Sequence, residues 1–218
     1  EINDLVIKRI NETYPEHSIY GEEKSEIKEN SKYIWVCDPI DGTMAFSVGL
    51  PTFVFSLALV DQSNGLPVLG IVNDPVMKSM YWAYKGSGAY RNGKKISVQN
   101  STALKNTYFN VAASGRSIGF SNIPLIKTLS EMKCAVMKFP SFIYGGIQVP
   151  NGKYVGAVFF KEHGHDVAAL KIITEEAGGK VTDLNGNERR YDEDGIGCLV
   201  SNGILHDELL KIIQTGKL

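Results

Sequence analysis

The sequence lacks a long hydrophobic run: it has no stretch of about 18 or more consecutive apolar residues. Its first residues also show no basic segment followed by an apolar one. A membrane-spanning helix needs about 20 apolar residues, and a secretion leader needs that basic-then-apolar order. We therefore expect neither a membrane span nor a secretion signal, and we expect a cytoplasmic protein.

The sequence also lacks an excess of charge of either sign. It contains 23 Lys and Arg residues against 24 Asp and Glu residues, for a formal net charge of -1. A protein that binds nucleic acid through its phosphates usually carries a basic field. We interpret the pairs Lys94-Lys95 and Arg189-Arg190 as solvated loop charges. A nucleic-acid partner is not expected.

Cysteine is scarce. The three cysteines, Cys37, Cys134 and Cys198, lie far apart and form no C-x-x-C pair, so we expect neither a disulfide framework nor a thiolate metal site. We interpret them as small buried hydrophobic residues. A nucleophilic Cys37 is not expected, because no histidine lies nearby in the sequence to activate its thiol.

What is present is enough apolar material for a large core, since 43% of the 218 residues are hydrophobic. In the first half, helical spacing of apolar residues runs up to Tyr14, where Pro15 must end the helix. Alternating apolar segments between turn residues then predict strands over residues 17–20, 33–38, 52–61, 70–74, 79–84 and 89–91.

The second half alternates between strands and helices. Strands are predicted over residues 107–112, 134–137, 154–160 and 197–201, and helices over 124–133, 143–149, 166–177 and 205–213. The pattern predicts the α+β class and a single domain, with an antiparallel meander in residues 1–105 and a mixed half in residues 106–218.

The most informative segment runs from Trp35 to Thr43, where an apolar strand ends at two carboxylates, Asp38 and Asp41. We expect Pro39 to stop the strand, which places both carboxylates at the carboxyl edge of a sheet. The same residues are also typical of a turn. From this segment alone, a turn without a functional role remains an open alternative.

Two further acids accompany this pair. Glu22 directly follows a short apolar segment, and Asp166 opens a predicted helix. Asp166 alone could be an ordinary acid at a helix start, where it complements the helix dipole. Four negative charges in one site would repel one another unless a cation were present, and a hard cation such as Mg²⁺ prefers carboxylate oxygen.

Three segments together resemble the signatures of the inositol monophosphatase family, which belongs to the Mg²⁺-dependent, lithium-sensitive phosphatase superfamily. They are Gly21-Glu22-Glu23, Asp38-Pro39-Ile40-Asp41-Gly42-Thr43, and His165 through Gly179. The resemblance covers nearly the whole chain, although the family usually has Trp where this chain has His165. It implies the layered α-β-α-β-α sandwich of the sugar phosphatase type, and a homodimer.

The resemblance also implies a ligand set for two to three Mg²⁺ ions. Glu22, Asp38 and the Ile40 carbonyl would hold the first ion, and Asp38, Asp41 and Asp166 the second, with Asp38 shared. The pair His163 and His165 could in principle bind metal, but nitrogen ligands suit softer ions. We therefore do not expect histidine ligation.

The activity that the resemblance implies is hydrolysis of a small phosphorylated polyol, sugar or amino alcohol, similar to inositol phosphate or histidinol phosphate. A metal-bound water would attack directly, with Thr43, Glu22 and Asp41 in catalytic roles. The backbone at Gly42 and Thr43 would bind the phosphate, since the first amides of a helix lack partners within it. In the family an upstream aspartate assists the threonine. It would precede Glu1, so we expect that a leading segment is missing from this sequence.

Substrate contacts are predicted less directly. The family commonly places an acid a few residues before the third signature; here the alignment puts Phe159 there, and only a shift brings in Glu162. Loops around Gly145 and Gly146, and around residues 114–116, are expected near the phosphate ester. We therefore expect poor preference for inositol phosphate over other esters.

Two alternatives remain open. A phosphatase of the haloacid dehalogenase type uses an aspartate nucleophile in a D-x-D-x-T loop, but the spacing here is one residue too long. A catalytically weak protein could instead keep the metal site in order to bind a phosphorylated metabolite or to support an assembly.

Overall fold

The computed structural model describes residues 1–113, 122–160 and 162–215, which form two β-sheets and six helices. The first sheet has the strand order β1-β2-β3-β4-β5-β6-β7, and only its β1–β2 pair is parallel. Its strands are β1 (Ser18–Gly21), β2 (Tyr33–Asp41), β3 (Val54–Asp61), β4 (Leu66–Asp74), β5 (Ser79–Tyr84), β6 (Ala89–Arg91) and β7 (Lys94–Ile96).

The second sheet has the order β11-β12-β10-β8-β9, in which β8 pairs in parallel with both β9 and β10. Its remaining pairs, β10–β12 and β11–β12, are antiparallel. The strands are β8 (Tyr108–Ala113), β9 (Ala135–Met137), β10 (Gly156–Phe160), β11 (Lys180–Asp183) and β12 (Cys198–Ser201).

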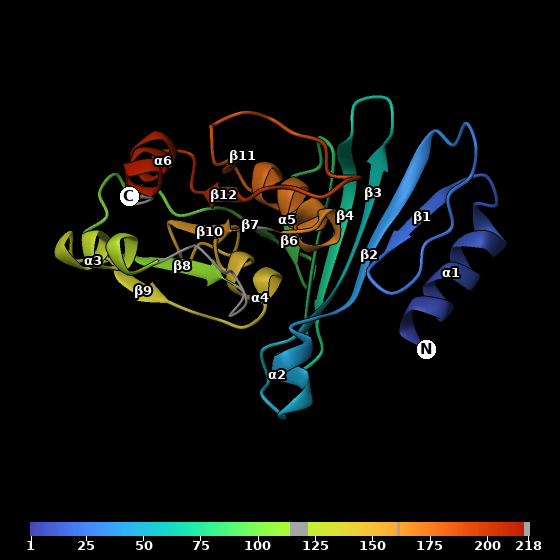
Figure 1. The fold of residues 1–218 in the computed structure, drawn as a ribbon, viewed down its shortest axis with the longest axis horizontal. Helices are drawn as coiled ribbons and strands as arrows, with labels where there is room; N and C mark the ends of the chain where they lie inside the picture. The colour runs from blue at the N-terminus through green and yellow to red at the C-terminus, as the bar shows by residue number, and fades with distance from the viewer. Residues whose placement is uncertain (114–121, 161, 216–218) are drawn as a thin grey trace.

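The helices occupy three layers around the two sheets (Figure 1). Helix α1 (Ile2–Thr13) covers the outer face of the first sheet; α4 (Phe142–Gly146) and α5 (Gly164–Glu176) lie between the sheets; α3 (Ile123–Glu131) and α6 (His206–Thr215) cover the far face of the second. Helix α2 (Thr43–Ser47) follows β2 at the edge of the first sheet. The expected α-β-α-β-α sandwich is confirmed.

Helix α5 is the centre of the main core, because both sheets pack against it. It is apolar almost all round, as a helix buried on every side must be, and its one buried cation, Lys171, pairs with Glu175 at 2.6 Å and Glu188 at 2.5 Å. On β4, a Cβ at Gly70 would lie 2.8 Å from the Ala169 carbonyl oxygen. The absence of a side chain there lets the helix lie close to the sheet, which fixes the position of its first turn.

The structure corrects the expectation that Pro39 stops its strand. Strand β2 continues to Asp41 with a shift of register, because Asp38 pairs with Ser56 and Asp41 with Val54. Three steps along β2 therefore match two along β3, which is a β-bulge. Proline has no N–H to donate, and a bulge is one of the few places in a sheet where it is tolerated.

Pro67 shows the same effect. It lies where the register of β3 and β4 shifts, and β4 begins at Leu66, earlier than the predicted start at residue 70. The short strands β7 and β11 were not predicted. With three and four residues they are too short for alternation to show.

All three cysteines are buried and free of disulfides. No helix in the described part of the chain is both long enough and apolar enough to cross a bilayer.

Buried His206 makes stability depend on pH. Its Nε2 lies 2.9 Å from Thr182 Oγ1 and its Nδ1 lies 2.8 Å from Ser201 Oγ, and burial lowers its pKa to about 4. In the unfolded state the ring binds its proton with an ordinary pKa of about 6.5. The stability that neutral His206 gives to the folded state is therefore complete above that pH. It is lost as the pH falls towards 4.

We predict that the free energy of unfolding, measured in urea, is lower at pH 4.5 than at pH 7, and that this loss is about 2 to 3 kcal/mol larger in the wild type than in His206→Gln. The variant removes the titrating ring and leaves all carboxylates in place. An identical pH dependence in both proteins would contradict the prediction.

Candidate metal centre

The topology brings together four carboxylates from three separate segments of the sequence. Strands β1 and β2 are parallel, with Gly21 in register with Cys37, so their carboxyl ends lie at the same edge of the sheet. Glu22 follows β1, and its N–H donates to the Cys37 carbonyl at 3.1 Å. Asp166, in the first turn of α5, completes the set because α5 packs on β2.

The ligand atoms fall into two overlapping groups. One carboxylate oxygen from each of Asp38, Asp41 and Asp166 lies within 4.8 Å of the others, and Glu22, Asp38 and His165 form a second group by the same measure. Asp38 belongs to both groups. The sharing expected from the family resemblance therefore has a geometric counterpart, with His165 as an addition.

These groups line one open cavity of about 250 Å³. Ile40, Gly42 and Thr43 lie on its wall beside the acids, and Met44, Pro140 and Phe142 provide an apolar part of the wall. Across the bulge, the Ile40 N–H donates to Asp38 Oδ1 at 2.9 Å, which holds that carboxylate in place.

The electrostatics of the cavity favour a cation. Burial, followed by the charges of Asp41, Glu22 and Asp166, raises the pKa of Asp38. Burial and the Asp41 charge raise the pKa of Asp166 to about 7. Within the described residues, no Lys or Arg pairs with Asp38, Asp41 or Asp166. Carboxylate oxygens that repel one another and lack a basic partner suit a hard divalent ion, so the residues present fit Mg²⁺.

Asp41 is held by the start of α4. The N–H of Phe142 donates to its Oδ1 at 3.0 Å, and those of Ile143 and Tyr144 donate to Oδ2 at 2.8 and 3.3 Å. The Ser141 hydroxyl, at the N-cap of α4, also donates to Oδ2. Burial raises the pKa of Asp41, and these hydrogen bonds oppose the rise.

The sequence interpretation missed this role of Ser141, although a serine just before a predicted helix is an N-cap signal. It also missed Asp194, which contacts His163 on the cavity wall. Asp194 accepts a hydrogen bond from the Tyr20 hydroxyl at 2.7 Å and lies 3.0 Å from His163 Nδ1. More than 170 residues separate Tyr20 from Asp194, and no local pattern signals that contact.

Gly42 lies at the turn from β2 into α2 and packs against the start of α4. Its φ of +91° is a conformation that favours glycine. A Cβ there would lie 2.7 Å from Ser141 Cβ and 2.8 Å from the Thr52 carbonyl oxygen. Glycine is therefore needed for packing against α4 as well as for the turn into α2, where the Thr43 hydroxyl donates to the Ile40 carbonyl at 3.4 Å.

Three residues predicted to contact substrate do not line this cavity. Gly145 and Gly146 are buried in α4, where a Cβ would meet the Asn110 side chain or the side chains of Leu170 and Phe159. Glu162 is buried and pairs with Arg189 at 2.6 Å. Residues 114–116 lie outside the described residues.

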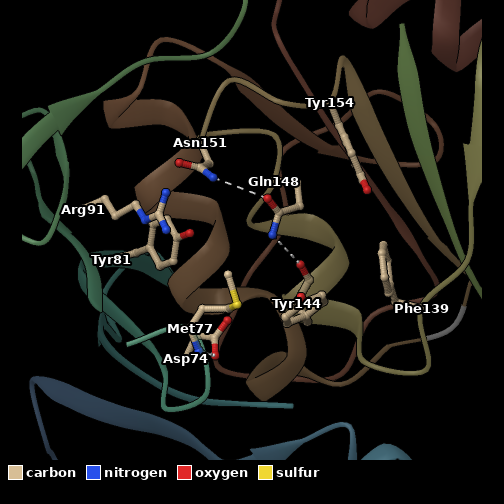
Figure 2. Close-up of a pocket in the computed structure, with 9 residues that line it drawn as sticks. All are labelled: Asp74, Met77, Tyr81, Arg91, Phe139, Tyr144, Gln148, Asn151 and Tyr154. Atoms are coloured by element: carbon tan, nitrogen blue, oxygen red, sulfur yellow. Dashed lines mark hydrogen bonds between the residues drawn. The ribbon is translucent and has the colours of Figure 1, made fainter. Parts of the chain in front are cut away.

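A second cavity, of about 290 Å³, lies between strands β4 to β6 of the first sheet and residues of the segment 139–154 (Figure 2). Figure 2 shows Arg91 and Tyr81 on one side of it and Phe139 and Tyr154 on the other. Its single carboxylate, Asp74, already accepts the N–H groups of residues 76 and 77. It has no cluster of acids among its described lining, so the four-carboxylate cavity is the candidate metal centre.

Comparisons with known proteins agree with this geometry. The sequence profile of the inositol monophosphatase family matches residues 1–217. The chain is 33% identical over 220 residues to a fructose-1,6-bisphosphatase/inositol-1-monophosphatase of Thermotoga maritima, which covers 98% of this chain and 80% of that protein. It is 32% identical over 201 residues to a Nus factor SuhB of Xylella fastidiosa, covering 88% and 70%.

A solved structure of a Thermotoga maritima IMPase has a similar fold. It superposes with a TM-score of 0.87 at 30% identity and covers 98% of this chain and 80% of that one.

The packing at Gly42 gives a test of the link between β2 and α4. We predict that Gly42→Ala lowers the free energy of unfolding by about 3 kcal/mol or more, because strain at positive φ adds to the clash with Ser141 and Thr52. Gly86→Ala is the matched control, with a φ of +82° and nothing within 4 Å of the added Cβ. It should cost only about 1 to 2 kcal/mol in the same urea titration. Equal losses would show that the clash is absent.

Proposed function

This chain belongs to the inositol monophosphatase family, and from that premise we propose that it hydrolyses a small phosphorylated polyol, sugar or amino alcohol with the help of Mg²⁺. Its reaction class is that of a phosphoric monoester hydrolase. The observation that carries the proposal is Asp38, whose carboxylate belongs to both groups of potential ligands in one cavity.

The proposed ligand assignment adds the Ile40 carbonyl, which belongs to the cavity wall, to the carboxylates of those groups. Glu22, Asp38 and the Ile40 carbonyl would hold one ion, and Asp38, Asp41 and Asp166 would hold another. The family resemblance implies two to three ions in all. When bound, Mg²⁺ offsets the carboxylate charges, attracts the phosphate and makes water a better nucleophile. The Asp41 carboxylate would act as an anionic group held in place by the N–H groups of Phe142 and Ile143. Glu22 would act as a second anionic group, on a backbone fixed by its N–H donating to the Cys37 carbonyl.

The remaining roles fall to α2 and its cap. The first amides of α2 have no partner within the helix, and Gly42 and Thr43 line the cavity, so they can donate to a phosphate there. The Thr43 hydroxyl, close to the Ile40 carbonyl, would orient the attacking water. Burial, followed by the Asp38 charge, raises the pKa of Cys37 to about 12, so its thiol is no nucleophile. These features support direct attack by water without a phosphoenzyme.

A second function is favoured by one comparison. A relative at 32% identity is named a Nus factor, a name that states no hydrolysis. A protein of that kind could keep the metal site and turn over esters weakly. Turnover of a general phosphate ester with Mg²⁺ separates the two functions.

We predict that p-nitrophenyl phosphate hydrolysis requires added Mg²⁺ and stops in EDTA. Asp38→Asn should reduce turnover by at least about 10²-fold and by more than Glu22→Gln, because it removes a ligand that two ions share. Asp207→Asn, a change at an exposed acid far from the cavity, is the control. Full turnover in EDTA would refute metal dependence, and binding of Mg²⁺ without turnover of any ester would favour the assembly role.

Substrate preference gives a further prediction. Phe159, which stands where the family resemblance implies a substrate-binding acid, is buried in the core, and Glu162 is committed to Arg189. The apolar wall of Met44, Pro140 and Phe142 offers no carboxylate to a substrate hydroxyl. An apolar wall discriminates weakly between hydroxylated molecules.

We therefore predict that kcat/KM for inositol 1-phosphate, fructose 1,6-bisphosphate and histidinol phosphate agree within about tenfold. Steady-state phosphate release measures all three. A preference for inositol 1-phosphate of about 100-fold or more would contradict the prediction, because such a ratio requires a buried polar acceptor.

A further inference from the structure

His165 is a buried imidazole whose Nδ1 has no protein partner and whose Nε2 has only one distant contact. It is the second residue of α5 and is 7% exposed. Its Nδ1 is buried without a hydrogen-bond partner. Its Nε2 lies 3.9 Å from Asp166 Oδ1, which is too long for a hydrogen bond. A buried polar ring left in this state is costly unless a ligand completes it.

The ring lies at the ion site. A ring nitrogen of His165 and carboxylate oxygens of Glu22 and Asp38 all lie within 4.8 Å of one another. His165 also lines the cavity that contains the other acids. Its position is fixed on two sides, by the Tyr20 ring at 5.7 Å and by the His163 ring, which stacks on it at 5.1 Å.

His163 is placed differently, although it also lines the cavity. Its Nδ1 lies 3.0 Å from Asp194, which in turn accepts the Tyr20 hydroxyl, and its side chain is 55% exposed. The His165 ring thus lies between the rings of Tyr20 and His163, and Asp194 contacts both of those residues. His163 belongs to neither group of potential metal ligands among the described residues.

We propose that His165 is a nitrogen ligand of the first ion site, beside Glu22 and Asp38, and that this site takes Mn²⁺ in preference to Mg²⁺. The inference rests on the proposed metal-dependent function. It adds that the two ion sites differ in the ion that they prefer. Mixed imidazole and carboxylate ligands suit transition ions, whereas the set Asp38, Asp41 and Asp166 is all oxygen and suits Mg²⁺. This reverses the expectation from sequence, which judged both histidines against a purely hard site.

The test is spectroscopic. The full chain is loaded with one equivalent of Mn²⁺ in excess Mg²⁺, and pulsed electron paramagnetic resonance is used to detect coupling of Mn²⁺ to an imidazole ¹⁴N. We expect the coupling in the wild type, its loss in His165→Gln and in His165→Asn, and its retention in the matched control His163→Gln. Calorimetric titrations should show the ratio of Mn²⁺ to Mg²⁺ affinity falling about tenfold or more in the His165 variants.

Three outcomes would overturn the proposal: no ¹⁴N coupling in the wild type, coupling that persists in both His165 variants, or coupling lost only in His163→Gln. An unchanged melting curve shows that a variant is folded, and two substitutions of different size guard against one that is not. Hydrolysis with Mg²⁺ alone is measured separately. If it persists while the nitrogen coupling is absent, the proposed function stands and the ligand assignment fails.

Discussion

The site depends on one hydrogen-bonded junction, between Asp41 at the end of β2 and the first turn of α4. Three backbone N–H groups and the Ser141 hydroxyl converge on that single carboxylate. The residues that form this junction lie about 100 positions apart in the chain. The junction ties the end of β2 to the layer between the sheets and fixes the Asp41 carboxylate at the cavity, beside the acids that β1, β2 and α5 bring there.

The same junction explains how a buried, strongly anionic cluster is tolerated. Hydrogen bonds to Asp41 favour its charged form and oppose the rise in its pKa. Asp38 and Asp166 accept fewer hydrogen bonds, and their pKa values are also raised. The raised pKa values mean that either a proton or a bound cation would offset the charges of Asp38 and Asp166. Ion binding and folding stability are coupled in such a site.

The sequence predicted most elements and the four acids, because their signals are local: apolar spacing, turn residues and carboxylates at the ends of segments. It failed where tertiary packing decides. Pro39 lies in a bulge that only the pairing of β2 with β3 creates. Glu162 turns towards Arg189 and away from the cavity, which its sequence position could not reveal. His165 was judged by its residue type, while its lack of a partner is visible only in three dimensions.

The order of the acids along the chain affects biosynthesis. Glu22, Asp38 and Asp41 leave the ribosome more than 100 residues before Asp166 and its neighbour His165. Helix α5, which carries those last two residues, must insert between both sheets before the cavity closes. A growing chain therefore holds only part of the acid cluster, and the complete cluster forms only when α5 has packed between the sheets.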